Sequence, residues 1–175
     1  MIYQLKIVDK FKYLGFIFRN DLKDDDDIAH KVRRLYALGN MLTRKFCKAN
    51  EPCKILMFKT YFSNLYCDSL WNDYKVSSIA CLKTAHNNIF RKLFHIRRFV
   101  IEEDQYRIIS VSQEFVSHGI DNLDVILRKS AYSLQQRLSS SRNSLVQALC
   151  NSEAAEYSAL RQRWRQVIHR PMPLQ

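Results

Sequence analysis

Residues 24–46 read DDDDIAHKVRRLYALGNMLTRKF, and their pattern decides the fold class. Apolar side chains return at steps of three and four residues, at Ile28, Val32, Leu35, Tyr36, Met41 or Leu42, and Phe46. That spacing places them on one face of an α-helix, so the stretch predicts a long amphipathic helix. The four aspartates directly before Ile28 admit two interpretations, which lead to different functions.

Asp24–Asp27 are expected to begin this helix rather than to bind metal ions. Aspartate is favoured at the N-cap and in the first turn, where it meets unpaired N–H groups and the positive end of the helix dipole. Carboxylates that hold two catalytic cations, about 4 Å apart, must instead be fixed rigidly. The run lies in a mostly polar stretch that begins at residue 20, and it directly precedes the helical pattern, so the sequence favours capping.

Helical spacing continues through most of the chain, so we expect a mainly α-helical fold. Pro is tolerated at the first helical position, Asp or Asn is favoured at the N-cap, and Gly often follows a helix end. With these signals we predict a helix with Pro52 near its start, a helix over 79–94 and a connection over 94–104. A helix over 105–116, ending at Gly119, and a helix from Asp121 or Asn122 to Leu138 are expected next. Two further helices are expected over 143–150 and 153–170.

Residues 2–18 predict a β-hairpin that ends near Arg19. Apolar and polar residues alternate at the start, and β-branched and aromatic residues dominate, which favours strands. Asp9 and Lys10 are expected to form the turn. Because two strands alone are barely stable in water, the hairpin should lie against helices or belong to a larger sheet.

Composition excludes several classes of protein. The 175 residues contain only three glycines and three prolines, which argues against an all-β fold with many tight turns. No apolar run approaches the roughly 18 residues of a membrane span, and the N-terminus lacks the pattern of a secretory signal. We therefore expect a soluble intracellular protein, in the nucleus or the cytoplasm, without membrane contact. The five cysteines lack metal or redox spacing and are expected to be buried thiols.

The net charge of +11 is concentrated in one segment. Fourteen Lys or Arg but only three acids lie between Ile28 and Val100, so this segment carries the whole excess. Such a distribution is typical of a surface that faces a polyanion, most often a nucleic acid. A solvated basic face is the alternative. The sequence contains no Gly-rich phosphate loop, no Gly-Xaa-Ser-Xaa-Gly elbow and no His-Glu-Xaa-Xaa-His, and no self-contained active site is predicted.

The segment FKYLG, Phe11–Gly15, resembles the strand that closes the palm of non-LTR (LINE-class) retrotransposon reverse transcriptases. The resemblance continues, in the family's order, through DLKDDDDIAHKVRRLYALGNMLTRKF, FKTYFSNLYCDSLW, LKTAHNNIFRKLF and VILRKSAYSLQQRLSSSRNSLVQAL, and more weakly through LRQRWRQVIH. It implies a hairpin over 1–20 at the end of the palm, a basic thumb-like helical region over 24–100, and a C-terminal helical region over 101–175.

The resemblance also implies roles for individual residues. The hairpin would be the primer grip, with Phe11, Lys12, Tyr13, Leu14 and Gly15 near the primer strand. The thumb would lie along the template–primer duplex, an RNA–DNA hybrid or RNA, gripped by shape and charge. The basic residues expected to contact phosphates there are Lys31, Arg34, Arg44, Lys45, Lys83, Arg91, Lys92, Arg97 and Arg98. For Phe11, Tyr13 and Leu14, packing beneath the sheet is the alternative, and for each basic residue, plain solvation.

One departure from the family limits the expected activity. The metal-binding Tyr-Xaa-Asp-Asp box lies upstream of the Phe-Lys-Tyr-Leu-Gly strand in the family, and the residues before Phe11 do not contain it. The resemblance therefore implies a non-catalytic part of an RNA-directed DNA polymerase, with no cofactor of its own, because Mg²⁺ would belong to the missing palm. Three alternatives remain open. The palm and fingers could be supplied by another chain, or the chain could be a helical protein-interaction or assembly module, or a decayed mobile-element remnant without a nucleic-acid role.

Overall fold

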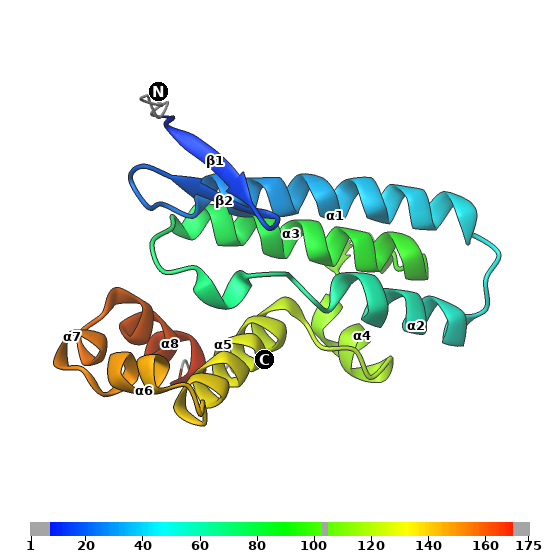
Figure 1. Cartoon of the computed structure of the whole chain (residues 1–175). Coiled ribbons are helices and arrows are strands. Elements are labelled where there is room, and N and C mark those ends of the chain that lie inside the picture. Colours follow the sequence, from blue (N-terminus) through cyan, green and yellow to red (C-terminus); the bar gives the residue numbers. More distant parts are fainter. Residues whose placement is uncertain (1–7, 103–104, 170–175) are drawn as a thin grey trace.

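The computed structural model describes residues 8–102 and 105–169, and these residues form a mainly helical fold with an N-terminal β-hairpin, as predicted (Figure 1). The elements are β1 (Lys10–Tyr13), β2 (Phe16–Arg19), α1 (Asp25–Lys45), α2 (Glu51–Phe62), the 3₁₀ helix η1 (Asp68–Leu70), α3 (Val76–Phe94), β3 (Phe99–Glu102), β4 (Gln105–Ile108), α4 (Val111–Ser117), α5 (Leu123–Ser139), α6 (Ser144–Asn151), α7 (Glu153–Glu156) and α8 (Ala159–His169).

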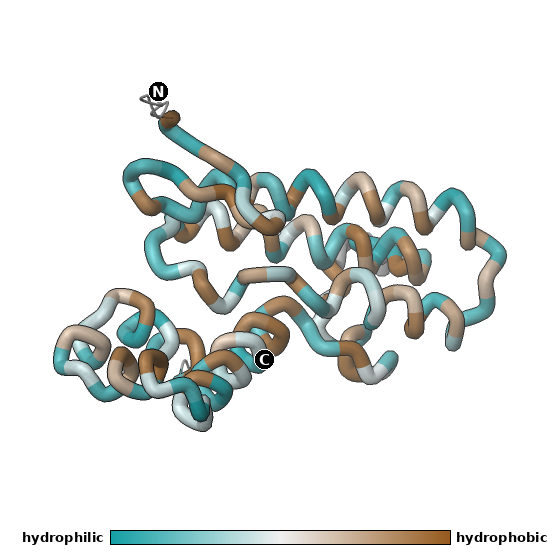
Figure 2. Tube along the Cα trace, viewed as in Figure 1, coloured by the Kyte–Doolittle hydropathy of each residue, from teal (hydrophilic) through white to brown (hydrophobic). Residues whose placement is uncertain are grey.

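Helices α1 and α3 lie side by side and form the frame of the fold (Figure 1). Along both helices, hydrophobic residues recur between hydrophilic ones, as in amphipathic helices (Figure 2). The two helices come close at Gly39, where an added Cβ would lie 2.9 Å from Ile89 Cγ1 and 3.0 Å from Ile89 Cγ2. The absence of a side chain at Gly39 therefore sets how near the two helices approach.

We expect Gly39→Ala to destabilise the fold by about 1–2 kcal/mol, because overpacking that costs up to about 3 kcal/mol outweighs the roughly 1 kcal/mol by which alanine favours a helix. Urea denaturation followed by circular dichroism measures the change. Combining it with Ile89→Ala, which removes the obstructing atoms, should make the two changes together cost less than the sum of the single ones. A variant Gly39→Ala that is more stable than the wild type would contradict this packing.

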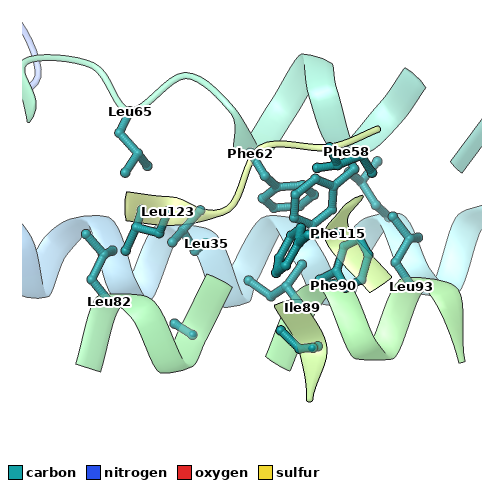
Figure 3. Packing of buried hydrophobic residues seen from close by; sticks show 14 of the residues in the cluster. Leu35, Phe58, Phe62, Leu65, Leu82, Ile89, Phe90, Leu93, Phe115 and Leu123 are labelled. Carbon is teal, nitrogen blue, oxygen red and sulfur yellow. The ribbon is translucent and has the colours of Figure 1, made fainter. Parts of the chain in front are cut away.

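An aromatic cluster fills the space between α2, α3 and α4 (Figure 3). Phe58 is fully buried, and its ring centroid lies 5.1 Å from that of Phe62 and 5.3 Å from that of Phe90. Phe115 of α4 stacks on Phe90 at 4.0 Å.

Asn50 caps α2 by accepting a hydrogen bond from the backbone N–H of Cys53, with Pro52 in the first turn as predicted.

The C-terminal helices attach to this body through η1 and α5. Asn122 caps α5, as predicted, and the helix packs against η1 and α8. Trp164 of α8 is buried, and its Nε1 donates to the carbonyl of Ser69 at 2.8 Å. The predicted helix over 153–170 is divided into α7 and α8, because Ser158 accepts a hydrogen bond from the N–H of Arg161 and begins a new helix.

The predicted turn of the N-terminal hairpin was wrong. Leu14 and Gly15, not Asp9 and Lys10, form the two-residue turn between β1 and β2. Both turn residues have positive φ, 47° and 85°, which is the signature of a type I′ turn and explains the glycine. Residues 1–7, in which the first predicted strand began, lie outside the described residues.

Two further predictions need correction. The segment predicted as a connection and the start of a helix form the antiparallel pair β3–β4, and α4 covers only Val111–Ser117. β-Branched and aromatic residues at 99–101 and at 106, 108 and 109 explain the strands. Gly119 does follow the end of α4, as expected, with φ of 59° one residue after the C-cap His118. The cysteines are free but not buried, since Cys47 and Cys81 are exposed and the other three are partly exposed.

Candidate nucleic-acid interface

The four aspartates at the start of α1 bind in pairs to two other parts of the protein, and the first pair binds the segment that leads into α3. Asp24 is buried, and its Oδ2 accepts from the backbone N–H groups of Asn72 (2.8 Å) and Asp73 (2.9 Å). Asp25 accepts from the N–H of Lys75 and the hydroxyl of Ser78, at the start of α3. These contacts join the N-terminal ends of the two frame helices.

Asp26 and Asp27 bind the hairpin instead. Asp26 pairs at the surface with Arg19 (3.3 Å) and Lys10 (3.8 Å). Asp27 is fully buried; its Oδ1 accepts from the N–H of Ile17 (3.1 Å) and its Oδ2 from Trp71 Nε1 (2.9 Å). The hairpin is therefore fixed to α1 through carboxylates.

The helix begins where the aspartates predicted, but the expected side-chain capping was wrong in detail. Asp24 occupies the N-cap position of α1 without a side-chain hydrogen bond to its own helix. Hydrogen bonds of Asp25 with Ser78 and Lys75 lower its pKa, whereas burial raises that of Asp24. Within residues 8–102 and 105–169, no group of three or more His, Cys, Asp or Glu is arranged to hold a metal ion.

The outward side of α1 carries four basic residues in two adjacent rows, which together we name the α1 stripe. Its members are Arg33, Arg34, Arg44 and Lys45. All four are exposed, and none makes a hydrogen bond or ion pair with another described residue. Steps of eleven residues, three helical turns, separate Arg33 from Arg44 and Arg34 from Lys45, so the stripe runs roughly 16 Å along the helix. It presents unneutralised cations to solvent at a regular spacing.

Other predicted phosphate-binding residues are engaged within the protein. Lys31 is only 3% exposed, lies 3.9 Å from Asp27 and donates to the carbonyl of Gly15 at 3.3 Å. Its prediction as a phosphate contact was wrong, because its ammonium group is enclosed. Lys83 is ion-paired with Asp124, and Lys92 donates to Asn40 at 2.6 Å.

Arg91 holds the region around β3 and β4 in place. Its guanidinium donates to the carbonyls of Arg97 (3.0 Å) and Ile109 (2.7 Å). Arg97 and Arg98 are exposed and lie directly before β3. Whether Lys83, Arg91, Lys92, Arg97 and Arg98 contact phosphates stays a prediction.

The hairpin residues predicted near the primer strand are largely at the surface. Phe11 is 54% exposed, Tyr13 61% and Leu14 69%, so the packing alternative does not describe them. Lys12 Nζ lies 3.4 Å from His30 Nε2. Gly15 turns the chain and has only ordinary contact with the ring of Tyr66, so its close-approach explanation was wrong.

Sequence reasoning missed part of the surface beside the α1 stripe. Arg33 was not selected, although its eleven-residue distance from Arg44 places both on one face. Tyr36 and Asn40 lie next to α3, where Asn88 donates to the hydroxyl of Tyr36 (3.3 Å) and Lys92 donates to Asn40. These pairs place hydroxyl and amide groups beside the cations, and only the packing of α1 on α3 reveals them.

Two buried titratable groups have displaced pKa values. His86 is enclosed by Phe58 and Phe115, neither ring nitrogen has a hydrogen-bond partner, and burial lowers its pKa to about 4. Asp68 accepts from the hydroxyl of Ser130 at 2.6 Å, and burial raises its pKa to about 6. In both, the charged form is disfavoured because it loses solvation.

Comparison with models of protein families, with curated proteins and with solved structures finds no match. Within the described part of the chain, none of the helices combines the length and the hydrophobicity required to cross a bilayer. Inference about function therefore depends on the charge, the exposure and the contacts given above.

Proposed function

We propose that this chain acts as the non-catalytic end-of-palm, thumb and C-terminal part of a LINE-class reverse transcriptase, and binds template–primer nucleic acid through the α1 stripe. The observation that carries the proposal is the unpaired state of Arg33, Arg34, Arg44 and Lys45 on one exposed face. Polyanions bind such faces by releasing counterions, without needing a base-specific contact.

The wider arrangement supports this proposal in two ways. The segment with the excess charge is the one that builds α1 and α3, and its free cations lie on the outward side, away from the core. Tyr36, Asn40 and Asn88 lie beside them and offer hydrogen-bonding groups suited to sugar and phosphate oxygens. An RNA–DNA hybrid presents 2′-hydroxyls and two phosphate backbones to such a surface.

We expect the triple variant Arg34→Glu, Arg44→Glu, Lys45→Glu to bind an RNA–DNA hybrid about 100-fold more weakly than the wild type near 0.1 M salt, because three phosphate contacts are replaced by repulsion. Fluorescence anisotropy with a labelled hybrid measures the affinity. Circular dichroism should show an unchanged fold, because these exposed side chains make no hydrogen bond or ion pair with the described residues.

A matched pair of single variants separates position from charge. Arg44→Glu and Arg142→Glu both reverse one exposed arginine, but Arg142 lies in the loop before α6, outside the basic segment. Only Arg44→Glu should weaken hybrid binding. Equal losses in both variants would mean that net charge alone acts, and the α1 stripe would have no special role.

A helical protein-interaction module is the second candidate, and the exposed hairpin favours it. All four residues of β1 are exposed, and Phe11, Tyr13 and Leu14 form an apolar surface. Palm and fingers in another chain would also use this surface. Light scattering after size exclusion distinguishes this candidate: self-association at micromolar concentration, abolished by Phe11→Ser with Tyr13→Ser, would favour it over a monomeric nucleic-acid-binding protein.

A further inference from the structure

A cleft of about 620 Å³ opens between the chain segment 63–70 and one face of α5. One side includes Tyr66, Cys67 and Asp68, and the other includes Ser130, Ser133 and Arg137. Cavities of this size accommodate molecules as large as a nucleotide. The cleft is formed by η1 and α5 and does not include the α1 stripe.

Asp68 lines this cleft and has an unsatisfied oxygen. The residue is 7% exposed, and its Oδ1 accepts from Ser130 Oγ (2.6 Å) and from the N–H of Ser69 (2.9 Å). Its Oδ2 is buried and accepts no hydrogen bond. A buried acceptor without a donor is unfavourable, and a ligand N–H group would relieve that cost. Because Oδ1 already has two donors, the ligand needs a donor for one oxygen only.

The other polar groups of the cleft define the rest of the ligand. Lys129 is paired with Asp121, whereas Arg137 is exposed and uses only its Nε, in a 3.4 Å hydrogen bond to the carbonyl of Ser133. The remaining guanidinium N–H groups are available for an anion. Tyr66 is 52% exposed and offers an aromatic ring, on which a planar base can stack. A donor, a planar ring and an anionic group together describe a nucleotide.

We propose that this cleft binds a nucleotide whose base carries an exocyclic amino group, with the amino group donating to Asp68 Oδ2, the base against Tyr66 and the phosphate at Arg137. Adenine, cytosine and guanine fit. Uracil fits poorly because its only N–H donor lies between two carbonyl oxygens, which would face the carboxylate. The inference that the nucleotide is part of a bound RNA strand rests on the proposed function. The inference that the cleft binds a free nucleotide does not.

Isothermal titration calorimetry with AMP, CMP, GMP, UMP and adenosine tests the site on the full chain. We expect saturable binding of AMP, CMP and GMP, with UMP about tenfold weaker. Asp68→Asn should weaken AMP about tenfold, and Arg137→Gln should weaken AMP but leave adenosine unchanged. Ser133→Phe, at an exposed position that lines the cleft, should block AMP without disturbing Asp68.

Absence of saturable AMP binding at about 1 mM, or Asp68→Asn and Ser133→Phe variants that bind AMP like the wild type, would overturn the proposal. Short oligo(A) and oligo(U) RNAs identify the source. If Asp68→Asn weakens oligo(A), the nucleotide belongs to single-stranded RNA; if only mononucleotides respond, it is free in solution. Failure of the two proposals is distinguishable, because hybrid affinity depends on the α1 stripe and AMP affinity on Asp68.

Discussion

Asp27→Ala is expected to destabilise the protein by about 3–5 kcal/mol. The change leaves the Lys31 ammonium, 3% exposed, without its carboxylate partner at 3.9 Å. It also removes the acceptor of Trp71 Nε1 and of the Ile17 N–H. Each buried donor left without an acceptor has its own cost, of roughly 1–3 kcal/mol. Urea denaturation, with unfolding followed by circular dichroism, measures the loss.

Two control variants make the result specific. Asp26→Ala removes a neighbouring carboxylate with only surface ion pairs, to Arg19 and Lys10, and should cost less than about 1 kcal/mol. Adding Lys31→Met to Asp27→Ala removes the stranded charge and should recover part of the loss.

The competing interpretation of the aspartates predicts the opposite result. If Asp24–Asp27 were a metal site, removal of one carboxylate in metal-free buffer would relieve repulsion and stabilise the protein. Added Mg²⁺ would then stabilise the wild type but not the variant. A stable Asp27→Ala variant with that Mg²⁺ response would overturn the structural role.

His86 and Asp68 are expected to give the stability of the protein opposite dependences on pH. The folded-state pKa of His86, about 4, lies below its ordinary value of 6.5. Its contribution is complete above pH 6.5 and is lost as the pH falls toward 4, since the unfolded chain takes up the proton first. The folded-state pKa of Asp68, about 6, lies above its ordinary 3.8, so stability is lost as the pH rises from about 4 to 6.

Each contribution amounts to about 3 kcal/mol, from about 1.4 kcal/mol per pKa unit. The free energy of unfolding of His86→Leu, relative to that of the wild type, should therefore rise by about 3 kcal/mol as the pH falls from 7 to 4. For Asp68→Asn, the same difference should rise by a similar amount as the pH increases from 4 to 7. Urea denaturation at several pH values measures both, and curves parallel to the wild type would show that these groups do not titrate as described.

The local elements could be predicted from the sequence because their signals are local. The apolar spacing of α1, Asn122 before α5 and Gly119 after α4 each act within one or two turns of a helix. The β3–β4 pair could not be separated from helix by such signals, because short apolar runs suit both. The hairpin turn was misplaced because Leu-Gly is a weaker turn signal than Asn-Gly.

The candidate interface could be predicted only in part, for a different physical reason. The charge count located the basic segment, but it could not show which cations are already neutralised. Lys83 meets Asp124 from 41 residues away, and Arg91 meets the carbonyl of Ile109 from 18 residues away. Only Lys31 offered a local signal, because Asp27 precedes it by four residues on the same helix.

The salt dependence of hybrid binding tests the central claim most directly. For the wild type, the logarithm of the binding constant should fall linearly with the logarithm of salt concentration, with a slope that corresponds to several phosphates. In the Arg34→Glu, Arg44→Glu, Lys45→Glu variant, this decrease should be less steep, with the magnitude of the slope reduced by about three. Undetectable binding of the wild type at low salt, or an equal slope in the variant, would contradict binding of nucleic acid through the α1 stripe.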